Sequence, residues 1–155
     1  MNHTPSFQFL RNAVADLTKA VDRLSFSYQK VERFSISLES VSDNDLEVVE
    51  AFCSRFSRVV DILINKVLRA LDNVELLPQG TLIDTLNRAE KRRLISNSLV
   101  LREMKEIRNV IAHDYAGMQL LEVFCFCREQ TPVLISIAYA VMHYASGCLG
   151  SDPKP

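Results

Sequence analysis

Residues 10–31 read LRNAVADLTKAVDRLSFSYQKV, and the spacing of their apolar side chains decides the fold class. These positions step alternately by four and three residues, which is the pattern of one buried stripe along a helix. They are Leu10, Val14, Leu17, Val21, Leu24, Tyr28 and Val31. The stripe predicts a long helix that packs nearly parallel to its neighbours, with Thr4 as its cap and Pro5 in its first turn.

Two further helices are predicted between residues 44 and 95. The first follows the polar break at residues 40–44 and ends before Pro78-Gln79-Gly80. Its buried positions are Leu46, Val49, Phe52, Phe56, Leu63, Val67 and Leu71. The second begins at a capping box formed by Thr81 and Asp84 and ends near Ser96-Asn97-Ser98. Its inward positions are Leu82, Ile83, Leu86 and Leu94.

The C-terminal part of the chain predicts two more helical regions. The first turns Val100, Met104, Ile107 and Ile111 inward, so its solvent face should carry Arg102, Lys105 and Arg108 or their neighbours. The second starts near Met118, is restarted by a cap and first-turn proline at Thr131-Pro132, and runs to about Ser146. Residues 151–155 are expected to form a disordered tail.

The whole pattern predicts an all-α protein. The chain has 155 residues, of which 48% are hydrophobic and 24% charged, as is normal for one soluble domain. The sequence shows no strand pattern, internal repeat or glycine-rich phosphate loop, and it contains only four glycines. We therefore expect an up-and-down bundle of four to five helices that forms a single domain over residues 1–150.

The charge is small overall but unevenly placed. The net charge of −1 gives no global signature of a nucleic-acid-binding protein. From Arg88 to Arg108, however, seven basic residues stand against three acidic ones, which leaves +4 on this segment. Such a run forms either a solvated helix face or a phosphate-binding surface.

The cysteines favour reduced thiols in a cytoplasmic protein. No signal-peptide pattern precedes Phe7, and Cys53, Cys125, Cys127 and Cys148 form no CxxC pair. Cys125 and Cys127 flank Phe126 in an apolar stretch, so all four thiols are interpreted as small buried side chains. The ligands for a zinc site are too few, and we expect neither a metal nor a cofactor.

Residues 133–149 are apolar enough to raise the question of a membrane span. The stretch has seventeen residues, which is at the short limit for crossing a bilayer, and it contains His143. We expect a buried helix of the bundle or a subunit interface, and no membrane contact.

The chemistry-bearing stretch is RNVIAHDY, residues 108–115. Arg108 is a permanently charged fork that suits phosphate oxygens, and His113 can exchange a proton near neutral pH. On a straight helix Asn109 and His113 share a face, as do Arg108 and Tyr115, whereas Arg108 and His113 lie about 140° apart. A site that uses both needs a distorted helix end, which Gly117 favours, or a second subunit.

The order of Arg108, Asn109, His113 and Tyr115 resembles the RX4HXY motif of the HEPN superfamily, in particular its HepT-like toxins. The resemblance implies a small helical domain with this motif near its end. It also implies a metal-independent ribonuclease whose two motif copies face each other across a homodimer cleft. The implied partner is a minimal nucleotidyltransferase antitoxin, which silences the toxin by adenylylating the Tyr115 hydroxyl.

The resemblance and the side-chain chemistry together assign roles to the motif residues. His113 is expected to move a proton, and Arg108 to stabilise negative charge on the phosphate of an RNA substrate. Asn109 would orient the substrate or His113, with Lys105 and Arg102 as further substrate-binding cations. Two alternatives stay open: a non-catalytic subunit that presents substrate to a nucleotidyltransferase, and an all-α interaction protein whose motif is structural.

Overall fold

The computed structural model describes residues 5–35, 41–113 and 118–150, and every regular element in these ranges is a helix. They are α1 (Pro5–Val31), α2 (Asp43–Asp61), the π-helical segment η1 (Ile62–Leu68), α3 (Arg69–Val74), α4 (Leu82–Lys91), α5 (Ser98–Ala112) and α6 (Met118–Gly150). The predicted all-α class is confirmed. Thr4 and the expected tail at residues 151–155 lie outside the described residues.

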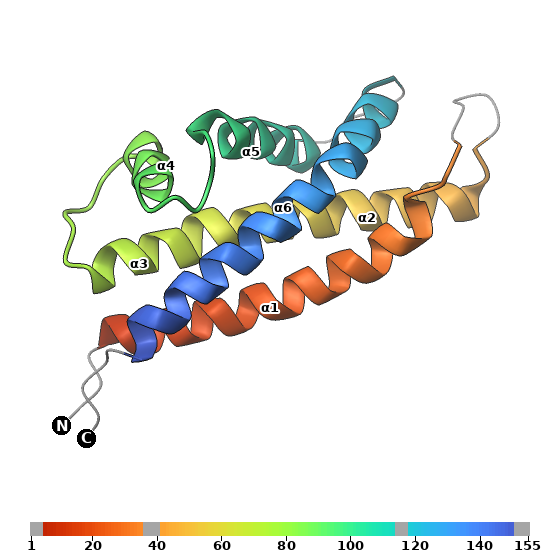
Figure 1. Cartoon of the computed structure of the whole chain (residues 1–155). Coiled ribbons are helices and arrows are strands. Elements are labelled where there is room, and N and C mark those ends of the chain that lie inside the picture. Colours follow the sequence, from red (N-terminus) through yellow and green to blue (C-terminus); the bar gives the residue numbers. More distant parts are fainter. Residues whose placement is uncertain (1–4, 36–40, 114–117, 151–155) are drawn as a thin grey trace.

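The helices form an up-and-down bundle (Figure 1). α2, η1 and α3 continue one another as a single rod that runs antiparallel to α1, and α6 lies across both with its C-terminal part along α1. The shorter helix α5 packs on α2, and α4 packs on α5 and η1. Two long antiparallel rods thus support the short helix that ends in the motif.

The buried stripe predicted for α1 is confirmed. Leu10, Leu17 and Leu24 are fully buried, and Val14 and Tyr28 are partly buried against the same core. Tyr28 belongs to an aromatic cluster. The centroid of its ring lies 6.3 Å from that of Phe52, and the Phe52 ring packs edge-on against Phe124 of α6 with the centroids 5.9 Å apart. These contacts join α1, α2 and α6 in one core.

The rod contains a π-helical turn that the sequence interpretation did not include. Within η1, Ile62, Leu63, Ile64, Val67 and Leu68 are all buried. Such a wide buried surface matches the position of η1, which contacts α1, α4 and α6 as well as its own rod. The wider π turn spreads buried side chains around more of the helix than a single α-helical stripe can.

The capping box at the start of α4 is confirmed. The Thr81 hydroxyl accepts from the Asp84 N–H at 3.3 Å, and the Asp84 carboxylate accepts from the Thr81 N–H at 2.8 Å. The hydrogen bond from the Thr81 backbone also holds the pKa of Asp84 below its ordinary value. The inward assignment of Ile83 was wrong, because Ile83 is 54% exposed while Thr85 and Leu86 face the core.

The predicted restart at Thr131-Pro132 was wrong, because α6 runs without interruption and holds Pro132 in its interior. Pro132 lacks the N–H that a helix interior normally uses. Thr131 is buried and donates its hydroxyl to the Cys127 carbonyl at 2.6 Å, so it acts within the helix and does not cap a new one.

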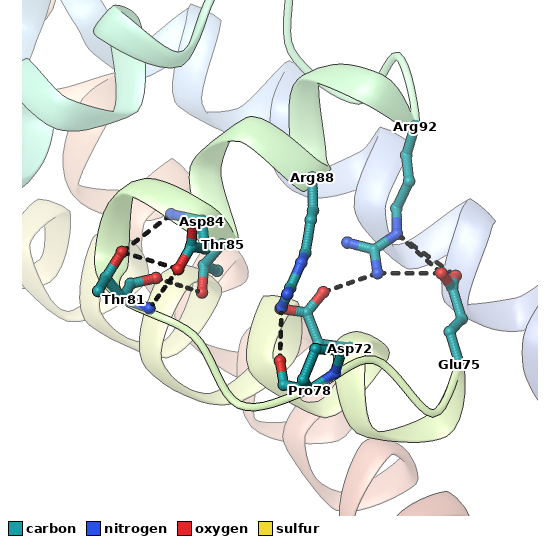
Figure 2. A network of polar contacts seen from close by, with 8 residues as sticks. All are labelled: Asp72, Glu75, Pro78, Thr81, Asp84, Thr85, Arg88 and Arg92. Atoms are coloured by element: carbon teal, nitrogen blue, oxygen red, sulfur yellow. Dashed lines mark hydrogen bonds and ion pairs between the residues drawn. The ribbon is translucent and has the colours of Figure 1, made fainter.

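An ionic network fixes α4 to the end of the rod (Figure 2). Arg92 donates to Asp72 at 2.7 Å and to Glu75 at 3.0 Å, and Arg88 donates to Asp72 at 3.1 Å. Tyr144 of α6 donates its hydroxyl to Glu75, and this hydrogen bond raises the pKa of Tyr144. Burial opposes the charge of Arg92, but its bonds to Glu75 and Asp72 outweigh that effect and its pKa is raised. The network therefore joins α3, α4 and α6.

Candidate active site on α5

Helix α5 is defined by a side-chain cap and a narrow buried stripe. The Asn97 side chain accepts from the Leu99 N–H at 2.8 Å and begins the helix. Met104 is fully buried as predicted, while Val100, Ile107 and Ile111 are only partly buried. The other fully buried residue of α5 is Leu101, which the predicted pattern omitted. The stripe is therefore rotated toward Leu101.

This rotation places Arg108 on the side of α5 that faces α2. Arg108 follows Leu101 by seven residues and Met104 by four, so all three lie on one face. Arg108 therefore lies only partly on the predicted solvent face. Its side chain is 32% exposed, and its Nη2 lies 3.4 Å from Oδ1 of Asp61 on α2.

Asp61 is the centre of a short polar chain beside Arg108. Its Oδ1 also accepts from the Asn65 side chain at 2.7 Å, and Arg108 Nη1 donates to Oδ1 of Asn109 at 3.4 Å. Asp61 is the last residue of α2, immediately before the π segment. Such π turns within helices are frequent at functional sites. The structure thus brings Arg108 and Asn109 together and adds Asp61 and Asn65.

Asp61 was missed by the sequence interpretation, although a signal for it exists. It is the single charged residue in the run VVDILI, residues 59–64, whose five apolar members are all buried. A carboxylate in such a run needs a partner, because charge is costly to place beside an apolar core. Arg108 is that partner here.

His113 lies where the helix ends. It is the C-cap of α5, with φ −100° and ψ 26°, and its backbone N–H donates to the carbonyls of Asn109 and Val110. The side chain is exposed. Because the backbone leaves the helix at His113, the 140° separation expected of a straight helix no longer fixes the imidazole relative to Arg108.

Tyr115 and Asp114 lie outside the described residues. The expected i, i+7 relation between Arg108 and Tyr115 therefore stays a prediction.

The +4 segment from Arg88 to Arg108 does not form one basic surface. Arg88 and Arg92 are bound to the carboxylates of the α4 network. On α5, Arg102 is exposed and lies 3.9 Å from Glu106, and Lys105 is half-buried. Arg102, Lys105 and Arg108 are the cations of this segment that lie on the motif's own helix, so they supply the basic character of α5.

The cysteines are free thiols with unequal burial. Cys53 and Cys127 are buried, and burial raises the pKa of Cys127, with its neighbour Cys53 adding to the effect. Cys125 is exposed and Cys148 half-buried, so the expectation that all four are buried was wrong. Over the described ranges, no three His, Cys, Asp or Glu side chains are grouped as a metal ion would need.

Comparison with known proteins places this helical layout and motif in a family. The family model described as ribonuclease HepT-like matches residues 24–141. The chain belongs to this family. No curated protein and no solved structure shows a significant match to it. The part of this HepT-like chain that matches the family model runs from the end of α1 through most of α6. It includes Asp61, Arg108, Asn109 and His113.

If this HepT-like chain binds RNA, as the ribonuclease description of its family suggests, replacing Asp61 by asparagine should tighten that binding by about two- to fivefold. The change removes a carboxylate that competes with phosphate for Arg108, and a partly exposed ion pair of this kind contributes less than about 1 kcal/mol. Stability should therefore change little. The measurement is fluorescence anisotropy with a 2′-O-methyl oligoribonucleotide, which lacks the free 2′-hydroxyl. Weaker binding would show instead that Asp61 holds Arg108 in its binding position.

Proposed function

We propose that the chain is a metal-independent endoribonuclease, the toxin of a toxin–antitoxin pair. The observation that carries the proposal is the end of α5, where a half-exposed arginine and an exposed histidine lie within six residues of each other. Family membership supports the ribonuclease class. The substrate, the dimer and the antitoxin are parts of the proposal.

In the proposed reaction, His113 accepts the proton of a ribose 2′-hydroxyl. The 2′-oxygen then attacks the adjacent phosphorus, the bond to the 5′-oxygen breaks, and that oxygen leaves with a proton from an acid or water. The products are a 2′,3′-cyclic phosphate and a free 5′-hydroxyl. Arg108 stabilises the extra negative charge on the phosphate oxygens, and Asn109 orients the substrate beside it.

The proposed site is completed by a second copy of the chain, so that Arg108 of one subunit meets His113 of the other. The apolar surface of α6 supports a dimer. α6 is long and apolar enough to cross a membrane, a test that the core helices of soluble proteins also pass. Only 28% of its most apolar window is buried. Val133 and Tyr139 are 42% and 56% exposed. A second subunit would remove this surface from water.

A groove of about 440 Å³ adjoins this exposed face of α6. It lies between the α4–α5 connection and α6, with Ile95, Val100, Val133 and Ile137 among its apolar walls. The groove brings the unpartnered face of α6 next to α5, the helix that carries Arg108. A dimer formed over this surface would therefore include α5 in or beside its interface.

The direct test is cleavage of single-stranded RNA by the purified chain in the presence of excess chelator. We expect cyclic-phosphate ends in the products and a single dimeric species in sedimentation. Absence of cleavage would contradict the enzymatic proposal and favour the substrate-presenting subunit of a nucleotidyltransferase.

The Tyr115→Phe variant should resist silencing by a minimal nucleotidyltransferase. The substitution keeps the ring and removes the Tyr115 hydroxyl, which is the proposed site of adenylylation. Intact-mass measurement after incubation with that partner and ATP should show adenylylation of the parent protein and none of the variant. Equal modification of both proteins would exclude Tyr115 as the acceptor.

A further inference from the structure

A groove between α1 and α2 concentrates positive charge within one turn of Asp61, the residue of α2 that contacts Arg108. It has a volume of about 340 Å³ and is lined by Ala20 and Arg23 of α1 and by Ala51, Ser54, Arg55 and Arg58 of α2. Of the described residues that line it, three are arginines and none is acidic. The chain as a whole has a net charge of −1, so this local charge of +3 is not a property of its composition.

A second hollow, on α4, shows the contrast. It is lined by Asp84, Asn87, Arg88, Glu90 and Lys91, so its two carboxylates offset its two cations. In the α1–α2 groove the arginines repel one another without such an offset. Like charges that are gathered in this way favour an anionic ligand, which relieves the repulsion.

One of the three arginines is already held in place. Arg55 donates from Nη1 to Oγ of Ser27 at 2.7 Å and to the carbonyl of Arg23 at 3.2 Å. Ser27 itself is buried. A guanidinium that is fixed before the ligand arrives loses little conformational entropy on binding. Arg23 and Arg58 are exposed, so their charges are open to a ligand from solvent.

The face of α2 that lines the groove leads along the helix toward the proposed active site. Ala51, Ser54, Arg58 and Asp61 follow one another at steps of three and four residues, so they lie on one face. Asp61 is the residue that contacts Arg108. From Arg55 to Asp61 the helix rises about 9 Å, which equals two to three nucleotides of a stacked strand at about 3.4 Å each.

Acidic residues stand beside the groove but are not among its lining residues. Asp22 of α1 and Glu47 and Glu50 of α2 are exposed neighbours in the sequence, and Asp16 of α1 lies 3.5 Å from Lys66. The charged side chains of the lining itself are those of Arg23, Arg55 and Arg58.

We propose that the α1–α2 groove binds the phosphates of the RNA strand that flanks the cleaved bond, with Arg23, Arg55 and Arg58 as the contacts. This inference rests on the proposed ribonuclease function. Contacts to phosphates do not distinguish one base from another, so the groove should strengthen binding of all single-stranded RNA alike.

The test is a double variant, Arg23→Gln with Arg58→Gln, which spares the structural bonds of Arg55. The control is Lys91→Gln with Arg33→Gln, which removes the same charge from exposed positions outside the groove lining. Binding is followed with a 2′-O-methyl oligoribonucleotide over a range of salt concentrations. Cleavage of the unmodified strand is measured in parallel.

We expect the groove variant to bind about tenfold more weakly than the control variant at moderate salt. Its plot of log affinity against log salt should be shallower by about 1.4, the value for two lost phosphate contacts to a single strand. KM should rise while kcat at saturating RNA stays close to that of the parent, because neither residue belongs to the motif.

The opposing outcomes are distinct. If the groove variant binds and cleaves RNA like the control variant, the groove is not part of the RNA path, while the ribonuclease proposal stands. If the groove variant keeps RNA binding but no longer binds a nucleotidyltransferase, the surface belongs to a protein partner and the inference is wrong. If the parent neither binds nor cleaves RNA, both proposals fail.

Discussion

Replacing His113 by alanine is expected to abolish RNA cleavage and to leave the melting temperature almost unchanged. Loss of a general base lowers a rate by about 100-fold or more. The side chain is exposed at the C-cap of α5, and its backbone N–H, which closes the helix, is kept in alanine. A cleavage assay and a thermal melt on the same preparation measure the two effects. His143→Ala is a matched control, because it removes another exposed histidine, on α6.

Unfolding of the His113→Ala variant would show a structural histidine, and full activity would remove His113 from the reaction. A mixture of the two inactive variants Arg108→Ala and His113→Ala then tests the shared site. In a mixed dimer, one composite site keeps both residues only if Arg108 and His113 come from different subunits. About a quarter of the parent activity should return after random exchange of subunits, because half of the dimers are mixed and one of their two sites is intact. No recovery would place both residues in one subunit.

Replacing Arg92 by methionine should destabilise the protein by about 3 kcal/mol. The Arg92 side chain is only 7% exposed, and its removal leaves the carboxylates of Asp72 and Glu75 without their main partner. Breaking a buried ion pair costs about 3–5 kcal/mol. The lower end applies here because Asp72 keeps Arg88 and Glu75 keeps Tyr144.

Urea unfolding measures this loss, and Lys91→Met on the same helix is the control. Lys91 is exposed, so its variant should change the free energy of unfolding by less than about 0.5 kcal/mol. Equal stability of the two variants would show that the network makes no net contribution to the free energy of unfolding. That result is physically possible, because Nη1 of Arg92 is buried without a hydrogen-bond partner among the described residues.

Most of the fold could be predicted because it depends on local patterns. Three features follow from residues that are close in sequence: the buried stripe of α1, the capping box of α4 and the end of the rod before Pro78. Pro132 misled the prediction because a proline after a threonine has the same sequence pattern at a helix start and inside a helix. The buried hydroxyl of Thr131, which decides between them, depends on tertiary packing.

The π turn had a partial signal in the sequence. Leu63, Val67 and Leu71 are spaced by four residues twice in succession, without the step of three that keeps an α-helical stripe straight. In an α-helix this spacing would carry the buried face about 80° around the axis, and a wider turn takes up that drift.

Less of the candidate site could be predicted. The motif residues were found from their order along the chain, but the partner of Arg108 lies 47 residues away on another helix. The charge sum from Arg88 to Arg108 also misled, because two of its arginines serve carboxylates of the rod. Arg23 and Arg55 of the α1–α2 groove are 32 residues apart in sequence and become neighbours only through the antiparallel pairing of the helices.

The π turn also sets the relative orientation of the two ends of the rod. One turn of this kind holds a residue more than an α turn, so it works as a single-residue insertion. Without it, Asp61 would point about 100° away from its present direction relative to Asp72. Asp61 faces Arg108, and Asp72 anchors α4. The number of residues in η1 therefore fixes the angle about the rod axis between Asp61 and Asp72. A chain shortened there by one residue could form only one of these two arginine contacts at a time.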